Sequence, residues 1–223
     1  MKKIKKLKML NLNREASIYA NYILNNYKFD SCFDIGCGDA LLESEIIKHN
    51  NEILYNGIDI NSGIYEVPKK NNIEIVKSRN DVFKKKEKYD AIFLFDVLEH
   101  DDNFFDLLDY SMNISKKYIF LSIPNEGTFQ NRLKFLFSGK IDSMGFEQLN
   151  KPLNHRHLWC VNPKEATNLI ETRINKNKFF IKEEINVYQF SNKFFKRLIQ
   201  NFLNFFIFPN VMISGKLLII SRD

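Results

Sequence analysis

Short apolar runs alternate with stretches whose apolar residues recur at helical spacing along most of this chain. Residues 90–96 read Asp-Ala-Ile-Phe-Leu-Phe-Asp, and this continuous apolar centre is typical of a parallel strand that is covered on both faces. Strands are predicted at residues 31–36, 53–60, 73–77, 90–96, 118–123, 179–190 and 215–221. Helices are predicted at residues 15–27, 41–49, 104–112, 129–137, 163–173 and 192–208. This alternation predicts an α/β fold with a doubly wound, mostly parallel sheet.

The first predicted strand ends in a tight glycine turn. Residues 33–39 read Phe-Asp-Ile-Gly-Cys-Gly-Asp, and a helical pattern follows at once. Gly36 and Gly38 have no side chains, so a ligand can approach their backbone, and the helix N-terminus adds inward-pointing N–H groups. Asp59 ends the next strand about 20 residues past Gly38, the spacing of a ribose-binding carboxylate. These features together predict a nucleoside-containing ligand.

Two common classes of nucleotide site do not match this turn. A dinucleotide-binding turn has a third glycine at the position that Leu41 occupies here, and no Gly-Lys-Ser/Thr of a P-loop occurs in the chain. A ligand with a ribose and a base but no pyrophosphate remains. Asp34 and Asp39 flank the glycines, and two acids favour a cationic ligand over a phosphate.

Composition narrows the class of protein further. The chain has 223 residues, enough for one good core, so residues 1–223 are predicted to form a single domain. The net charge of +6 is mild, and the lysines of residues 1–8 are interpreted as a solvated terminus rather than a grip on an anionic partner. The three cysteines show no metal or disulfide spacing, and no apolar run approaches 18 residues, so a cytoplasmic location is expected.

Several segments resemble class I methyltransferases that use S-adenosylmethionine (SAM), and most closely the MetW-like proteins. Residues 33–39 resemble motif I, and residues 95–100 (Phe-Asp-Val-Leu-Glu-His) resemble the strand-four motif of the small-molecule enzymes. The narrower signal lies between residues 124 and 161. The residues that carry it are Pro124, Asn125, Gly127, Asn131, Arg132, Leu133, Gly139 and Lys140, together with residues 154–161 and the later Phe-Pro-Asn-Val of residues 208–211.

The resemblance implies a fold and a set of cofactor contacts. The implied sheet is Rossmann-like and seven-stranded with an antiparallel C-terminal edge strand, a helical extension at residues 1–27 and a lid or acceptor-binding insertion at residues 126–160. The cofactor is SAM, with its methionine half along the glycine turn, its ribose on Asp59 and its sulfonium near Asp96. Asp34 is expected to fix the turn more than to touch the ligand. The full set of predicted cofactor residues is Asp34, Gly36, Cys37, Gly38, Asp59, Ile60, Asn80, Asp81, Asp96 and Val97.

Histidines are the candidates for acid–base chemistry on the acceptor, because imidazole titrates near neutral pH. The candidate catalytic residues are His100, His155 and His157. Asp96, Glu99 and His100 also resemble the cluster of metal-assisted methyltransferases. The preferred interpretation has no metal: Glu99 caps the following helix and His100 packs against the sheet, so both are weak candidates as ligands.

Three functions are compatible with these residues. The leading hypothesis is methyl transfer to a small molecule or to a glycan or lipid precursor. The alternative is a MetW-like regulatory subunit that binds SAM and a homoserine O-acyltransferase. A nucleic-acid methyltransferase is disfavoured, because residues 96–99 do not form an Asn/Asp-Pro-Pro-Tyr-type tetrapeptide. Peripheral membrane contact through the aromatic segment 192–208 and a homodimer are further hypotheses.

Overall fold

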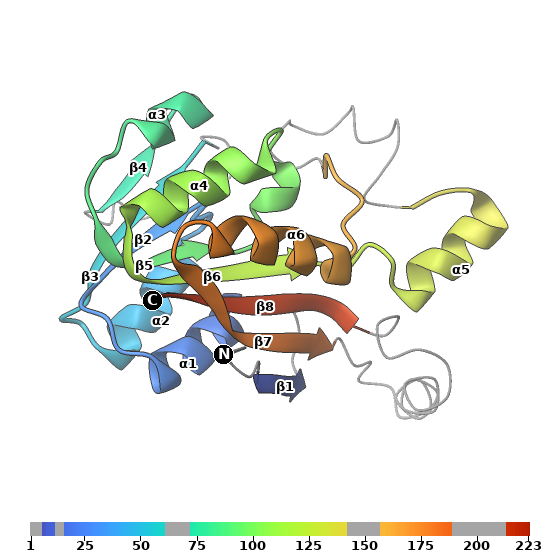
Figure 1. Ribbon diagram of the computed structural model, residues 1–223, viewed down its shortest axis with the longest axis horizontal. Helices are drawn as coiled ribbons and strands as arrows, with labels where there is room; N and C mark the ends of the chain where they lie inside the picture. The colour runs from blue at the N-terminus through green and yellow to red at the C-terminus, as the bar shows by residue number, and fades with distance from the viewer. Residues whose placement is uncertain (1–5, 12–15, 61–71, 142–156, 189–212) are drawn as a thin grey trace.

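A computed structural model describes residues 6–11, 16–60, 72–141, 157–188 and 213–223. One sheet lies between two helical layers: α4 and α6 cover one face, and α1 and α2 cover the other (Figure 1). The helices are α1 (Ala16–Asn26), α2 (Leu41–His49), α3 (Arg79–Phe83), the 3-10 turn η1 (Leu98–His100), α4 (Phe104–Ile114), α5 (Phe129–Ser138) and α6 (Pro163–Asn175). The strands are β1 (Lys6–Asn11), β2 (Ser31–Ile35), β3 (Leu54–Asp59), β4 (Ile73–Ile75), β5 (Tyr89–Leu94), β6 (Ser115–Pro124), β7 (Phe179–Tyr188) and β8 (Ile213–Arg222).

The strand order is β1-β7-β8-β6-β5-β2-β3-β4. Five neighbouring strands are parallel, in the order β6, β5, β2, β3 and β4. Strand β8 is antiparallel to both of its neighbours, β6 and β7. The predicted fold class is therefore confirmed, with the antiparallel last strand between β6 and β7 rather than at the outer edge. Gly215 permits this close pairing, since a Cβ atom there would lie 2.6 Å from the carbonyl oxygen of Ile123.

The N-terminal segment differs from the expected helical extension. Residues Lys6–Asn11 form β1, which pairs in parallel with β7 and puts an eighth strand at the edge of the sheet. Lysines alternate with apolar residues here, and an edge strand tolerates charged residues because one side of it is not paired. Helix α1 follows at Ala16–Asn26, close to its predicted bounds.

The core has one cluster on each face of the sheet. Leu108 of α4 and Ile170 of α6 are fully buried against one face, and Tyr19 and Ile23 of α1 against the other. Every residue of β5 is buried, as the continuous apolar run predicted. Each large apolar side chain buried in this way contributes roughly 1.5–3 kcal/mol, so the two layers hold the central strands firmly.

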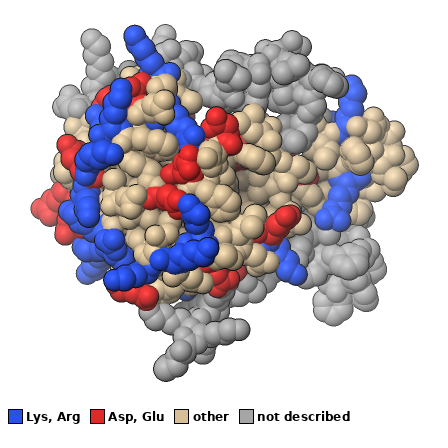
Figure 2. All heavy atoms as spheres, turned by 45° about the horizontal axis from the view of Figure 1, so that its top comes forward, with Lys and Arg blue, Asp and Glu red and all other residues tan. Residues whose placement is uncertain are grey.

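The basic residues gather away from the carboxyl ends of the central strands. Most of the Lys and Arg visible in Figure 2 lie toward the end of the molecule that carries α3 and the amino ends of the strands. Lysines of the described residues also pair with acids, including Lys84 with Asp81 and Lys117 with Asp90. In the part of the chain that the structure describes, no helix has the length and apolarity needed to cross a membrane. The predicted helix at residues 192–208 lies outside the described residues.

Candidate active site

The glycine turn lies between β2 and α2 and is tied to β3. The main-chain N–H groups of Gly36 and Cys37 both donate to the carbonyl of Ile58, at 2.8 and 3.2 Å. Gly36 has φ +74°, and a Cβ atom on it would lie 2.6 Å from Cγ2 of Val97. Gly38 also has a positive φ, of 54°. The turn therefore needs glycine at both positions, and it leaves main chain accessible to a ligand.

Asp59 lies directly against this turn. Its Oδ2 accepts a hydrogen bond from the Gly38 N–H at 2.9 Å. The pairing of β2 with β3 puts Asp34 opposite Gly57, so the ends of the two strands are adjacent. A carboxylate thus stands at the carboxyl end of the second strand, in the position predicted for the ribose contact.

Asp34 and Cys37 point into the protein rather than along the turn. Oδ2 of Asp34 accepts a hydrogen bond from the Tyr55 hydroxyl at 2.9 Å. Burial raises the pKa of Asp34 to about 7; the bond from Tyr55 lowers it, and the nearby charge of Asp59 raises it. Burial also raises the pKa of the Cys37 thiol, whose sulfur would be 3.0 Å from a Cβ atom on Gly57. These contacts support a turn-fixing role for Asp34, and they leave only the main chain of Cys37 for a ligand.

Asp96 follows β5 in an unusual conformation. Its φ is +52°, a region that residues other than glycine rarely adopt. The Ser122 hydroxyl at the end of β6 donates to Oδ1 of Asp96 at 2.7 Å and accepts from the Asp96 main-chain N–H, also at 2.7 Å. Backbone strain of this kind persists where neighbouring groups enforce it and is often found at functional sites. Ser122 was not among the predicted site residues.

A polar cluster lies where η1, which begins two residues after Asp96, meets the segment that precedes α6. The rings of His100 and His157 are in edge contact, with centroids 4.8 Å apart. Nδ1 of His157 lies 2.6 Å from Oε1 of Glu126, and the main-chain N–H of Leu158 donates to the Glu99 carbonyl at 2.8 Å. Two of the three predicted catalytic histidines therefore meet, whereas His155 lies outside the described residues. Glu126 was absent from the predicted site residues.

Residues that carry the MetW-like signature hold Glu126 in place. Asn125 donates through Nδ2 to the Ile213 carbonyl at 2.6 Å, which ties the end of β6 to the start of β8. Asn131 donates to the Glu126 carbonyl at 2.9 Å, and Arg132 donates to the Gly127 carbonyl at 2.8 Å. The start of α5 thus folds back on residues 125–127. The signature marked this segment in the sequence. The acid that directly follows Pro124 and Asn125 was the signal that could have identified Glu126.

The remaining predicted cofactor residues lie directly after β3 and on α3. Ile60 follows β3 and is exposed. Asn80 and Asp81 lie on the short helix α3, where the Asp81 carboxylate accepts from the Ser78 hydroxyl at 2.9 Å and pairs with Lys84 at 2.6 Å. Their contact with the adenine stays a prediction, and these bonds give Asp81 a local role at the start of α3.

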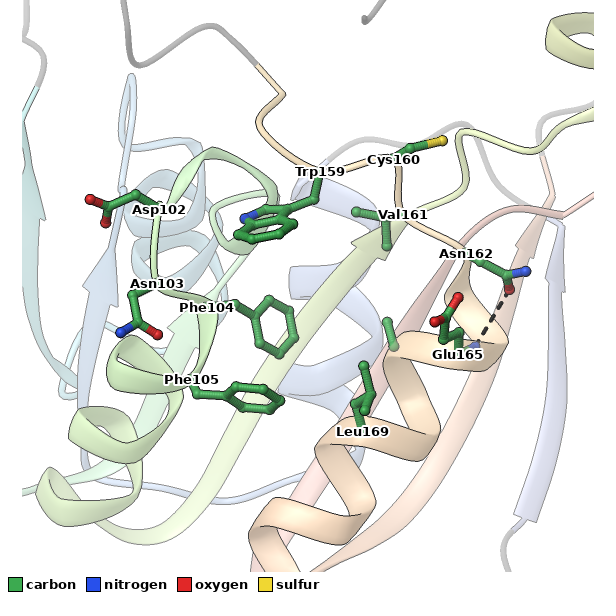
Figure 3. Close-up of a pocket in the computed structure, with 11 residues that line it drawn as sticks. Asp102, Asn103, Phe104, Phe105, Trp159, Cys160, Val161, Asn162, Glu165 and Leu169 are labelled. Atoms are coloured by element: carbon green, nitrogen blue, oxygen red, sulfur yellow. Dashed lines mark hydrogen bonds between the residues drawn. The ribbon is translucent and has the colours of Figure 1, made fainter.

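An apolar pocket of about 280 Å³ opens between the start of α4 and α6 (Figure 3). The Trp159, Phe104 and Phe105 rings line one side of it, and Leu169 of α6 points in from the other. The indole of Trp159 donates to the Asp101 carbonyl at 2.7 Å, which fixes the ring over the pocket mouth. Trp159 is two residues from His157, so the segment that carries His157 also contributes to the lining of the pocket.

The fold and the arrangement at the strand ends define a class I SAM-dependent methyltransferase fold. A glycine turn after β2, an acid at the end of β3 and a second acid after β5 lie on three neighbouring parallel strands. The family model for the methionine biosynthesis protein MetW matches residues 20–204, and the chain belongs to this family.

Solved structures support the fold. A SAM-dependent methyltransferase from Archaeoglobus fulgidus is 18% identical, with 95% of each chain covered and a TM-score of 0.55. The plantazolicin methyltransferase BamL, solved with SAH, is 14% identical over 92% of this chain and 82% of its own, with a TM-score of 0.59. Magnesium protoporphyrin IX methyltransferase from Synechocystis PCC 6803, also with SAH, is 15% identical over 93% and 83%, with a TM-score of 0.56. No curated protein sequence matches significantly.

Proposed function

We propose that this protein transfers a methyl group from SAM to a small-molecule acceptor. The observation that carries the proposal is the contact between Gly38 and Asp59, which joins an open glycine turn to a carboxylate at the ends of adjacent parallel strands. Ligands of doubly wound sheets bind at this edge, where the chain crosses from one side of the first strand to the other. Here that strand is β2, which has β3 on one side and β5 on the other.

The residues present fit this cofactor. Gly36 and Gly38 carry no side chains of their own, and Val97, one of the predicted cofactor contacts, packs directly on Gly36. Asp59 would accept the ribose hydroxyls, and the acids at positions 59 and 96 suit a ligand with two cationic groups. When bound, SAM supplies a methyl group on a positively charged sulfur, so the chain's own task is to orient the acceptor and exclude water.

The apolar pocket supports an acceptor with an apolar part. Its aromatic and aliphatic walls would favour a lipid precursor or an aromatic molecule over a bare sugar, because burial of apolar surface there is favourable and sugar hydroxyls would lose water. Trp159, which lines the pocket, follows His157 of the polar cluster by two residues. An acceptor that extends from the pocket to this cluster would place its reactive oxygen beside the histidines, which are suited to help remove its proton.

Calorimetry tests the cofactor half of the proposal. Purified protein is titrated with SAM, with SAH and with NAD, and we expect binding of the first two only. Radiolabelled SAM incubated with a small-molecule extract then tests transfer, with labelled product expected in the apolar fraction. Absence of SAM binding would contradict the proposal. Label found only in polar sugars would contradict an acceptor with an apolar part.

Family membership supports a second candidate function. The matching family is described by its role in methionine biosynthesis, so a SAM-binding subunit that regulates a homoserine O-acyltransferase is consistent with the same cofactor residues. Such a protein would bind SAM without turnover. Co-purification with the acyltransferase and the absence of labelled product from any extract would favour this function over catalysis.

A further inference from the structure

Two histidines and two glutamates from three separate segments converge at η1. One ligand atom from each of Glu99, His100 and His157 lies within 4.8 Å of the others. The Glu99 side chain is 1% exposed and Glu126 is 5% exposed, so both carboxyl groups are removed from bulk water. Buried carboxylates are stable only where positive charge or hydrogen bonds offset the loss of solvation. A divalent cation at the centre of the cluster would supply such a positive charge.

The bond between Glu126 and His157 has the form that accompanies metal-binding histidines. The Glu126 carboxylate lies 2.6 Å from Nδ1 of His157, where it can accept the ring proton. A neutral ring that donates through Nδ1 has its lone pair on Nε2. Histidine ligands commonly donate their second ring N–H to a carboxylate, which fixes the tautomer and orients the ring.

The chemistry of the donors selects the kind of ion. Two imidazoles and one carboxylate suit Zn²⁺, Mn²⁺ or Fe²⁺, whereas Mg²⁺ and Ca²⁺ prefer oxygen ligands alone. Ligand atoms around a tetrahedral zinc ion lie about 3.4 Å apart, given bonds of roughly 2.1 Å. The atoms within 4.8 Å of one another thus need to approach by at most about 1.4 Å, which side-chain rotation can supply.

We propose that Glu99, His100 and His157 bind one divalent transition-metal ion, with Glu126 as the residue that orients His157. Three protein ligands leave a coordination position open, as in catalytic zinc sites. That position would take the oxygen of an acceptor hydroxyl or carboxylate, whose proton a metal makes easier to lose. The acceptor role rests on the proposed function, but the metal site itself does not.

The test is metal binding by the full chain after treatment with a chelator. Titration with Zn²⁺, Mn²⁺ and Mg²⁺ is followed by calorimetry and by metal analysis of the dialysed protein. We expect one Zn²⁺ or Mn²⁺ per chain and Mg²⁺ binding weaker by about 100-fold or more. Glu99→Gln and His157→Gln should lose about 100-fold or more in affinity, and Glu126→Gln about 10- to 100-fold, the usual cost of removing such an orienting partner.

Matched variants separate this site from incidental metal binding. His49→Gln removes an exposed histidine on α2, and Cys160→Ser removes an exposed thiol close to the cluster in sequence. Both should bind the ion as the wild type does. Circular dichroism shows which variants fold, and the metal should raise the melting temperature of the wild type but not of a folded His157→Gln protein.

Other outcomes would overturn the proposal. It fails if no stoichiometric ion binds, or if Glu99→Gln and His157→Gln bind it as the wild type does. If those variants do not fold, the Co²⁺ absorption spectrum of the wild type decides: bands of nitrogen and oxygen ligation are expected, and a thiolate charge-transfer band contradicts the site. SAM binding by the metal-free protein is measured separately, so failure of the metal site and failure of the proposed methyl transfer are distinguishable.

Discussion

The main-chain N–H of Gly38 donates to the carboxylate of Asp59 across 2.9 Å. The two residues come from consecutive strand ends, and this bond makes the glycine turn and the acid one unit. The Asp59 side chain can therefore keep the glycine turn in place without covering the backbone of the turn. The same carboxylate is the group predicted to bind the ribose, so the shape of the turn and recognition of the ligand depend on one residue.

Asp59→Asn should lower the affinity for SAM by about 10- to 100-fold. The amide keeps the shape of the side chain but loses the charge, and a hydrogen bond to a charged group contributes roughly 1.5–3 kcal/mol. Calorimetry with SAM measures the change. Glu52→Gln alters an exposed acid shortly before β3 and should bind SAM as the wild type does. Equal affinity in the Asp59 and Glu52 variants would contradict the assigned ribose contact.

Gly36→Ala should destabilise the fold more than Gly139→Ala. Both glycines have φ near +70°, but a Cβ atom at Gly139 meets nothing within 4 Å, whereas at Gly36 it collides with Val97. The positive φ alone costs an alanine roughly 1–2 kcal/mol, and the collision adds roughly 1–3 kcal/mol. Urea unfolding measures both variants. Adding Val97→Ala should recover part of the loss at Gly36, and an equal loss at both glycines would show that the contact with Val97 is unimportant.

Asp34 should make the protein less stable as the pH rises. Its pKa in the fold is raised from 3.8 to about 7 by burial, so the native state keeps a proton that the unfolded chain has released. The free energy of unfolding therefore falls between about pH 4 and pH 7 and then levels off, by a few kcal/mol at about 1.4 kcal/mol per pKa unit. Asp34→Asn should remove this part of the pH dependence. Urea unfolding at pH 5 and pH 8 checks it, and an identical pH dependence in both proteins would contradict the assignment.

Ser122→Ala should weaken SAM binding several-fold. The hydroxyl both donates to the Asp96 carboxylate and accepts from its main-chain N–H, and loss of these bonds allows the strained backbone to relax. We expect a loss of stability of about 1–3 kcal/mol as well. Ser111→Ala, a buried serine on α4 that bonds to the Leu107 carbonyl, is the matched control. It should lose stability without losing SAM affinity, and the same pattern in Ser122→Ala would give that residue a structural role only.

Leu169→Asp should raise the KM for the acceptor by about tenfold and leave SAM affinity unchanged. Leu169 points into the apolar pocket from α6 and is 49% exposed, so the change should not impair folding. A carboxylate there opposes the burial of an apolar group. Steady-state methyl transfer measures the effect, with Ile47→Asp, a similarly exposed position on α2, as the control. An unchanged KM would exclude this pocket from acceptor binding.

The sequence predicted the layers of the fold because strand and helix periods were strong. Helix α2 has its predicted bounds, and β5 is buried throughout, as its apolar run required. Lys6–Asn11 was missed because its lysines indicate solvent, and only pairing with β7 makes them compatible with a strand. Helix α3 is five residues long, too short for a periodic signal.

The parts of the site that neighbouring residues in the sequence define were predicted. The parts that depend on contacts between distant segments were missed. The two glycines and the acid at the next strand end can be recognised in the sequence. The structure gives the glycines positive φ angles and brings Gly38 and Asp59 into contact. The bond from Glu126 to His157 joins residues far apart in sequence, so no spacing could reveal it. Because the contact between Glu126 and His157 was not visible in the sequence, His100 was interpreted as a packing residue and Glu99 as a capping residue.

The direction of β8 has a practical consequence for work with the purified protein. Because Ser221 pairs with Tyr118 and Gly215 with Pro124, the chain finishes beside the amino end of β6, on the side of the molecule remote from the glycine turn (Figure 1). An affinity tag or fluorophore attached after Asp223 would project from that side. Immobilisation through such a tag would leave the opposite rim facing solution for ligand-binding measurements.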